Sequence, residues 1–315
     1  MMLQVSSSPH IRDQATTRRL MLDVIIALCP ALLASFWLFG LRAILITLIA
    51  VVSAVAFEYL SRLVMKRTQT ISDLSAVVTG LLLAFNLPPT VPYWLPVVGS
   101  AVAVIVVKQM FGGIGQNFVN PALASRIILV LSFPAAMTAF VVQSAPVSIT
   151  SPMIDLIAKA TPLAQAQAGG ALPSYLELLL GFGKGGCLGE VSILALLIGA
   201  IYLVIRKVIK LWIPLVYIAT VAVIAALGGQ DPLYHVLSGG LIIGAFFMAT
   251  DYVTSPLTTK GKVIFALGCG LLTGVIRLFG GMAEGVSYSI VLMNIMVPHL
   301  DRWTTPVQFG GGVKK

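Results

Sequence analysis

Apolar runs of roughly the length of a membrane-spanning helix follow one another along almost the whole chain. Hydrophobic residues make up 58% of the sequence and charged residues only 10%. A soluble domain uses about 25% charged residues, so this chain has too few to cover a water-facing surface. Because a helix satisfies its own backbone hydrogen bonds inside lipid, the pattern predicts an all-α polytopic membrane protein.

The apolar runs divide into about ten predicted transmembrane segments. Some are shorter than the roughly 20 residues that a straight spanning helix needs. Two of them end in polar, proline-containing breaks, at 85–89 and 250–256. Helices broken in this way face a cavity or other protein, because lipid cannot satisfy the freed backbone groups. The predicted segments are 20–39, 43–64, 72–86, 92–109, 120–143, 190–206, 211–228, 233–250, 262–279 and 283–300.

Basic residues are distributed unevenly over the loops between these segments. If the N-terminus is cytoplasmic, most of them lie on the cytoplasmic side, and only Arg42, Lys159, Lys184 and Arg277 lie on the other. Positively charged loops stay in the cytoplasm, so both termini are predicted to be cytoplasmic and the loop 144–189 extracytoplasmic. The net charge of +9 then follows from topology. Nucleic-acid binding is not expected, because no basic stripe or reader motif is present.

The three cysteines, Cys29, Cys187 and Cys269, are far apart in the sequence. They show none of the close spacing of a zinc or iron–sulfur ligand set, so no metal site within this chain is predicted. Any redox chemistry would therefore need an organic cofactor.

Two stretches of the chain resemble each other in order and spacing. A run at 80–86, a span and a Phe-Gly-Gly sequence at 111–113 recur as 244–251, a span and 279–281. We interpret them as an internal duplication. Each copy holds five spans, and because five is odd the second copy is inverted, which predicts two inverted five-helix repeats with broken helices. The predicted parts are a cytoplasmic segment 1–19, a first repeat 20–143, an extracytoplasmic loop 144–189, a second repeat 190–300 and a cytoplasmic tail 301–315.

In inverted repeats, polar sites gather near the membrane midplane, where the broken helices of the two halves meet. Asn86, Thr250 and Asp251 stand at the two breaks and are candidates to line a central ion pathway. An equally good interpretation is that these residues only cap helix ends near an interface.

Four carboxylates, Asp23, Glu58, Glu190 and Glu284, lie at or inside the ends of predicted spans. A carboxylate within the membrane suggests ion or proton handling, but one at the end of a span is more often just solvated. Asp23, on the first span, and Glu284, beside the second Gly-Gly pair, are the better candidates for an ion pathway.

The densest polar sequence near the membrane runs from 111 to 126. Asn120 and Pro121 are typical of an N-cap followed by a first-turn proline, and the amides of such a helix start can receive a carbonyl or an anionic group. Asn117 and Asn120 are therefore candidate ligand-binding residues. Arg126 follows one to two turns later, where a buried arginine needs a partner. It either binds a ligand, or forms a structural ion pair or reaches the interface.

Five stretches match a known family in order: 108–122, 132–138, 188–190, 277–285 and 292–298. Through them the chain resembles the RnfD family of the Rnf ion-translocating ferredoxin:NAD oxidoreductase complex and, more distantly, the NqrB family of the sodium-translocating NADH:quinone reductase. The resemblance covers nearly the whole chain. It implies a protein of the bacterial cytoplasmic membrane that relays electrons within a larger complex and helps to couple their transfer to sodium or proton translocation.

Members of this family carry FMN joined by a phosphoester to a threonine in an outward-facing loop, within a pattern like Asp-x-x-Ser/Thr-Gly-Ala-Thr. Here Asp155, Ala160 and Thr161 match this pattern, whereas Ala158 and Lys159 replace the usual hydroxyl residue and glycine. Lys159 is also a candidate to attract the flavin phosphate. The predicted topology independently places Thr161 in an exposed loop, where its hydroxyl can act as the nucleophile that takes the flavin phosphate.

The resemblance also implies a second, non-covalent flavin, such as riboflavin, for which the region from Asn117 to Arg126 is the candidate site. The implied partners are the other Rnf subunits (RnfA, RnfB, RnfC, RnfE and RnfG), above all the extracytoplasmic flavoprotein RnfG, with a flavin transferase, sodium ions or protons, and lipid. NAD and ferredoxin are not expected to bind this chain, which has no dinucleotide fingerprint. Two alternatives also fit the residues: an ion or small-solute channel without a redox role, and a membrane scaffold.

Overall fold

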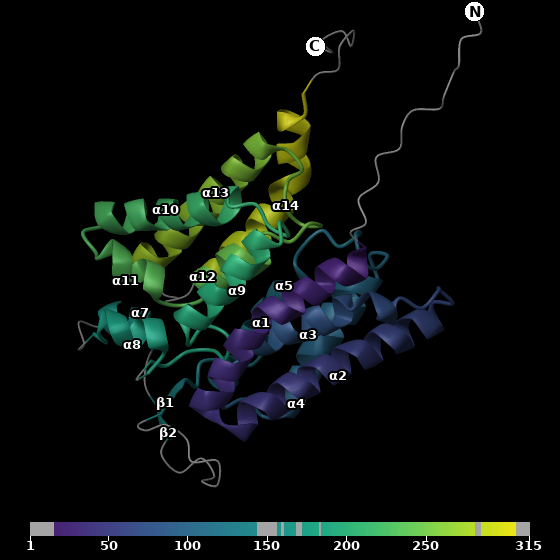
Figure 1. The fold of residues 1–315 in the computed structure, drawn as a ribbon, viewed down its shortest axis with the longest axis horizontal. Helices are drawn as coiled ribbons and strands as arrows, with labels where there is room; N and C mark the ends of the chain where they lie inside the picture. Colours follow the sequence, from purple (N-terminus) through teal and green to yellow (C-terminus); the bar gives the residue numbers. More distant parts are fainter. Residues whose placement is uncertain are drawn as a thin grey trace, which may run out of the picture.

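The computed structural model describes residues 16–143, 156–158, 161–167, 172–182, 184–280 and 285–306. Within them, three helices are long and apolar enough to cross a membrane: α1 (Thr17–Phe39), α2 (Leu41–Val64) and α13 (Thr259–Phe279). Shorter apolar helices accompany them, namely α3 (Ser75–Phe85), α4 with η2 (Trp94–Gln109), α5 (Pro121–Ser132), α9 (Ile193–Ile205) and α10 (Trp212–Leu227). Figure 1 shows these helices side by side in one largely helical body.

The first half of the chain is built around α2. This helix packs against α3 and α4, and the short turn η1 (Ile71–Asp73) leads from its end into α3. A Cβ atom on Gly80 would lie 2.7 Å from the Cα atom of Val51, so the glycine permits the close crossing of α3 with α2. The π-helical segment η2 (Val102–Gln109) completes α4.

Helix α5 begins as the sequence predicts. The side chain of Asn120 caps it by accepting hydrogen bonds from the amides of Ala122 and Leu123, and Pro121 occupies the first turn. The expected span 120–143, however, is helical only as far as Ser132. Pro134 explains the break, because the residue before a proline is kept out of the helical region, and Phe133 adopts φ −133° and ψ 57°.

Short elements follow that break. They are α6 (Pro134–Met137), β1 (Val141–Gln143) and β2 (Leu156–Ala158), and the two strands pair antiparallel with Val142 opposite Ile157. This strand pair is a departure from the predicted all-α fold. The helices α7 (Pro162–Gln167) and α8 (Tyr175–Leu180) lie next along the chain.

The second half contains α9, α10, α13 and α14 (Val286–Thr304). The predicted segment 233–250 is not one helix but three pieces: α11 (Pro232–Leu237), α12 (Leu241–Ile243) and the π-helical η3 (Gly244–Met248). The break between α11 and α12 falls at Gly239, which has a φ of +66° that favours glycine. The sequence predicts a continuous span here and a polar break only after it, at 250–256, so the break at Gly239 is an additional one that the sequence pattern does not predict.

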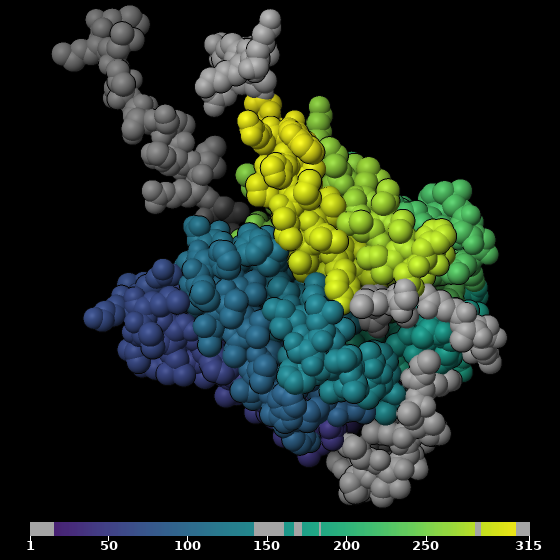
Figure 2. Space-filling model, turned by 180° about the vertical axis from the view of Figure 1, so that it is seen from behind, coloured from purple at the N-terminus to yellow at the C-terminus, as the bar shows by residue number. Residues whose placement is uncertain are grey.

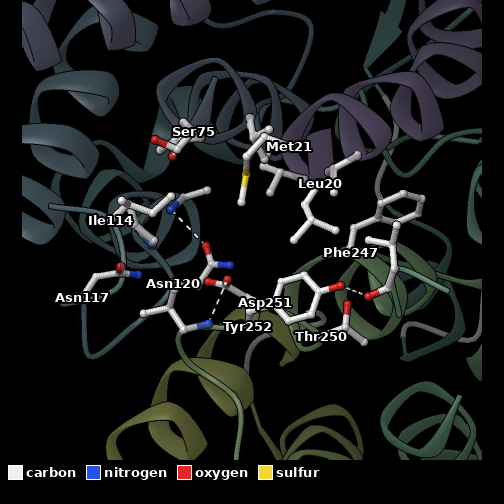
Figure 3. Close-up of a pocket in the computed structure, with 18 of the residues that line it drawn as sticks. Leu20, Met21, Ser75, Ile114, Asn117, Asn120, Phe247, Thr250, Asp251 and Tyr252 are labelled. Atoms are coloured by element: carbon white, nitrogen blue, oxygen red, sulfur yellow. Dashed lines mark hydrogen bonds between the residues drawn. The ribbon is translucent and has the colours of Figure 1, made fainter. Parts of the chain in front are cut away.

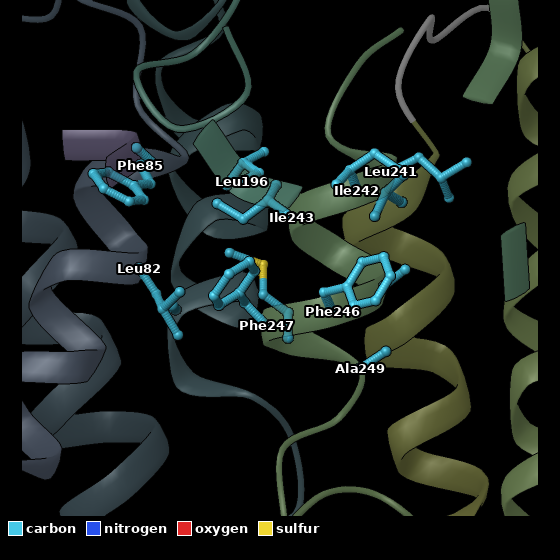
Figure 4. Close-up of a cluster of buried hydrophobic side chains, with 14 of the residues drawn as sticks. Leu82, Phe85, Leu196, Leu241, Ile242, Ile243, Phe246, Phe247 and Ala249 are labelled. Atoms are coloured by element: carbon cyan, nitrogen blue, oxygen red, sulfur yellow. The ribbon is translucent and has the colours of Figure 1, made fainter. Parts of the chain in front are cut away.

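The two halves meet along one continuous seam, which the space-filling view shows between the blue and the yellow-green parts (Figure 2). At this seam α1 packs along α9, and α5 packs against α14. Side chains of α3, including Leu82 and Phe85, face those of α12 and η3, including Ile243 and Phe247 (Figure 4). The hydrophobic core therefore joins the two halves.

A loop segment also crosses the seam. The amides of Leu188 and Gly189 donate to the carbonyl oxygens of Leu87 (3.0 Å) and Phe85 (2.9 Å), so the segment before α9 is hydrogen-bonded to the end of α3. In Figure 1 the beginning of α1 and the end of α14 lie on one side of the molecule, and β1, β2, α7 and α8 lie on the other.

Candidate functional site

A cavity that opens to the surface lies between the two halves. Its volume is about 100 Å³, and open space continuous with the solvent adjoins it. Its walls come from α1, α3 and the 114–122 region of the first half, and from the end of α9 and η3 of the second (Figure 3). Most of the lining is apolar. The apolar lining residues include Leu20, Met21, Val24, Val78, Leu82, Leu203, Phe246 and Phe247.

Four polar residues that the sequence singles out line this one cavity: Asn117, Asn120, Thr250 and Asp251. The first two are the predicted ligand-binding residues, and the other two stand at the predicted polar break of the second half. The structure thus brings the candidate ligand site and part of the candidate ion pathway to one place.

Asn120 and Asp251 lie next to each other at the centre of the cavity view (Figure 3). The Asn120 side chain accepts from the α5 amides and donates to the carbonyl oxygen of Met248 at 3.5 Å. The Asp251 carboxylate accepts from the amide of Val253 and the hydroxyl of Thr254, both at 3.3 Å. Both side chains are therefore held in place, with polar atoms at the wall.

Lys108 also lines the cavity, and it belongs to a buried ion pair. Its Nζ lies 2.7 Å from Glu58 Oε2 and 2.6 Å from Ser75 Oγ, and the other Glu58 oxygen accepts from the hydroxyl of Thr70 at 2.9 Å. The prediction of a solvated Glu58 is wrong, because this side chain is 0% exposed. The helical spacing of Ala50, Ala54 and Glu58 on the buried face of α2 is the signal that indicates this burial.

Arg126 is buried behind the cavity and is not among its lining residues. Its guanidinium donates to Ser287 Oγ (2.7 Å) and Asn86 Oδ1 (3.3 Å) and lies 3.7 Å from Cys187 Sγ. Asn86 in turn donates to the carbonyl oxygen of Leu82 at 2.7 Å. Asn86 therefore serves both as the C-cap of α3 and as an Arg126 partner, in a polar cluster between the two halves.

Asp23 is buried at the contact between α1 and α9. Its carboxylate accepts from the hydroxyl of Tyr202 (2.9 Å) and from Arg206 Nε (3.3 Å). Leu20 and Val24, close to it on α1, line the cavity, so this ion pair joins the two halves beside the cavity wall.

Thr161 is only 4% exposed, which differs from the predicted exposed hydroxyl. Its Oγ1 accepts from the amide of Ala164 at 3.3 Å, and the carbonyl oxygen of Pro162 accepts from the hydroxyl of Tyr234 at 3.1 Å. The hydrogen bond from Tyr234 ties the start of α7 to α11 beside Thr161. Asp155, Lys159, Ala160 and Glu284 lie outside the described residues.

Three further charged residues are buried as well: Lys184 and Glu190 before α9, and Arg277 near the end of α13. Arg277 is 1% exposed and donates to the carbonyl oxygens of His235 (2.5 Å) and Ser238 (3.1 Å). Lys184 donates to the carbonyl oxygen of Glu190 at 2.9 Å, and Glu190 Oε1 accepts from the amide of Cys187 at 2.8 Å. The prediction of a solvated Glu190 is therefore wrong, since the residue is 3% exposed.

The sequence also matches known proteins. The model of the NQR2, RnfD, RnfE family matches residues 4–310. The D subunit of the Na⁺-translocating ferredoxin:NAD⁺ oxidoreductase complex of Acetobacterium woodii is 50% identical over 311 residues, which cover 98% of this chain and 95% of that protein. The D subunit of the proton-translocating complex of Clostridium ljungdahlii is 41% identical, covering 97% and 96%. The D subunit of the ion-translocating oxidoreductase complex of Escherichia coli is 36% identical, covering 98% and 99%.

Proposed function

Because the chain belongs to the NQR2, RnfD, RnfE family, we propose that it is the D subunit of an ion-translocating ferredoxin:NAD⁺ oxidoreductase complex of the Rnf type, in a bacterial cytoplasmic membrane. Near-complete coverage of three relatives that are 50%, 41% and 36% identical supports this assignment. In the complex it would work with RnfA, RnfB, RnfC, RnfE and RnfG. It would not be catalytic alone.

The cavity between the halves is the proposed binding site of a non-covalent flavin. Its lining is mostly hydrophobic with a few polar groups, which is the usual composition of a small-molecule site. Apolar walls suit the ring system of a flavin such as riboflavin, and Asn117, Asn120 and Lys108 supply polar groups for its pyrimidine edge. A flavin bound there supplies the electron-transfer chemistry, and these side chains bind and orient it.

Thr161 is the proposed attachment point of a covalent FMN. Its hydroxyl provides the oxygen of a phosphoester, with Asp155, Lys159 and Ala160 as the neighbouring recognition residues. Because Thr161 is buried, a flavin transferase needs the segment around Thr161 to open, or needs to act before this segment packs. The two flavins would then lie toward opposite sides of the membrane, since the cavity opens near the start of α1 and Thr161 lies beyond the other ends of the helices.

Two inverted five-helix repeats with cytoplasmic termini are the proposed topology. The contacts of α1 with α9 and of α5 with α14 support it, because each pair joins corresponding helices of the two halves. Exposed tryptophans support the membrane position, because Trp37, Trp94, Trp212 and Trp303 all stand at or near helix ends, where tryptophans lie at the membrane surface. Asp23, Asn86, Asp251 and Glu284 are the proposed ion-pathway residues for sodium or protons.

A comparison of flavin fluorescence tests the redox assignment. The native chain, Thr161→Ala and the control Thr150→Ala are produced with the flavin transferase, and the denatured protein bands are viewed under ultraviolet light. Fluorescence in the native chain and the control, lost in Thr161→Ala, is expected. A dark native band contradicts the covalent site and favours an ion or small-solute channel without a redox role.

A further inference from the structure

Helices α10 and α13 run parallel to each other and in close contact. A Cβ atom on Gly270 of α13 would lie 2.4 Å from the side chain of Thr220 on α10. One turn later, a Cβ atom on Gly274 would lie 2.6 Å from the side chain of Ile224. Because the two contacts advance in the same direction along both helices, the starts of α10 and α13 lie side by side.

Four basic residues gather where these two helices begin. Lys210 stands just before α10, and Lys260 and Lys262 are in the first turn of α13. Arg302 is in the last turn of α14, which contacts the start of α13. The like charges of Lys210 and Lys262 are close enough to repel each other. We call these four residues the basic cluster.

The basic cluster holds more positive charge than the protein around it balances. Within the part of the chain that the structure describes, none of its members forms an ion pair. Asp301 attracts Lys262, but its carboxylate also accepts from the amide of Leu257 at 2.9 Å. The first turn of α13 contains no acidic residue, although the start of a helix favours negative charge. An anion from outside the chain would therefore relieve the repulsion.

An exposed apolar stripe leads from the basic cluster along α13. Ile264, Leu267 and Leu271 follow Lys260 at helical spacing, and all three side chains are exposed. On a membrane-spanning helix, such a stripe faces the acyl chains of lipid. Trp212, in the first turn of α10, is also exposed, as tryptophans commonly are at the level of the lipid headgroups. The cluster and the stripe together fit a molecule with an anionic head and an apolar tail.

We propose that the basic cluster binds the headgroup of an anionic phospholipid, with an acyl chain lying along the stripe of Ile264, Leu267 and Leu271. Lysine and arginine side chains between helices at the membrane surface attract lipid phosphate groups. A phospholipid supplies the missing negative charge and covers the apolar stripe with one molecule. The proposed topology places this lipid in the cytoplasmic leaflet, and the inference is independent of the flavin sites.

Lipid binding by the full-length chain, purified in detergent, tests this site. The probes are diphosphatidylglycerol, phosphatidylcholine and glycerol 3-phosphate, which carries the anion without acyl chains, and native mass spectrometry measures what is bound. The main variant is Lys210→Gln with Lys262→Gln. The matched control is Arg18→Gln with Arg19→Gln, which removes the same charge from the exposed first turn of α1.

The native chain and the control are expected to bind diphosphatidylglycerol in preference to the other two probes. The main variant is expected to bind it about tenfold to thirtyfold more weakly, because each lysine at the membrane surface adds to the attraction for anionic lipid. The variant loses no ion pair, so it should fold. A second variant, Lys260→Gln with Arg302→Gln, changes exposed side chains alone and repeats the test.

Native affinity in both variants, or an equal loss in the control, overturns the lipid site. A native chain that binds phosphatidylcholine equally well overturns it too, and equal binding of glycerol 3-phosphate assigns the basic cluster to a soluble anion instead. If the native chain shows no lipid preference and the main variant no longer co-purifies with the other subunits of the complex, the cluster contacts an acidic protein surface and the proposal is wrong.

Discussion

At the residue scale, the free-energy cost of burying charge determines which side chains must find partners inside the protein. Lys108 and Glu58 are 50 positions apart in the sequence and form a buried ion pair that joins the end of η2 to α2. A charge taken out of water is costly unless a partner and further hydrogen bonds compensate for it. Thr70 and Ser75 supply those bonds here, so four side chains, from α2, η2, α3 and the loop before η1, depend on one another.

Removing one member of this pair is therefore expected to destabilise the fold strongly. Glu58→Ala leaves the Lys108 ammonium buried without its carboxylate, and the free energy of unfolding should fall by about 3–5 kcal/mol. Thermal unfolding in detergent measures the loss. Glu58→Gln keeps the shape and an acceptor oxygen, so a smaller loss is expected. Equal losses for both variants would show that packing, and not charge, sets the stability at this position.

These burials mark the limit of prediction from the sequence. Asn120 can be predicted as an N-cap, because the Asn-Pro pair is a local signal for a helix start. The spacing on α2 indicates that Glu58 is buried, but it does not identify Lys108 as its partner, which is 50 positions away. Arg277 cannot be distinguished from a solvated residue at the end of a span, because its partners are backbone carbonyl groups. The gathering of Asn117, Asn120 and Asp251 around one cavity can be anticipated only through the proposed duplication.

At the scale of the helix, close crossings depend on small residues. A Cβ atom on Gly199 of α9 would overlap the carbonyl oxygen of Ala27 on α1, so the two backbones are nearly in contact. Helices in lipid associate through such packing, since lipid provides no hydrophobic drive between them. The helix positions themselves follow the apolar runs of the sequence, whereas the breaks at Phe133 and Gly239 follow from proline and glycine inside those runs.

Gly199→Leu is expected to force α1 and α9 apart. Overpacking of this kind costs about 1–3 kcal/mol, and the contact cannot relax without moving backbone. The melting temperature in detergent should fall clearly. The matched control is Ile198→Leu, which changes a neighbouring side chain that is 52% exposed and should leave the melting temperature unchanged. A stable Gly199→Leu chain would contradict the α1–α9 contact.

At the scale of the whole molecule, the two sides differ in what they carry. The start of α1 and the end of α14 lie on the side near the cavity opening, and α7 with α8 lies on the other (Figure 1). In the proposed topology, the side with the start of α1 and the end of α14 is cytoplasmic, and the side with α7 and α8 is extracytoplasmic.

Single cysteines test that orientation. In a chain whose native cysteines are replaced, Leu172→Cys should react with a membrane-impermeant maleimide added to intact spheroplasts, because Leu172 is exposed on the α7–α8 side. Gln116→Cys, at an exposed position beside the cavity, should react only after the membrane is opened. The reverse pattern of labelling would show that the chain is inserted the other way round.

The cavity takes its walls from both halves of the chain, so neither half alone holds a complete site. Binding of a ligand in the cavity and association of the two halves are therefore linked equilibria. A bound ligand favours association, and association favours binding. A ligand present at a hundred times its Kd would add about 2.7 kcal/mol to the cohesion of the halves. If the chain were cut within the 144–189 loop, the cofactor would help to hold the two fragments together. Loss of the cofactor would then allow the fragments to dissociate.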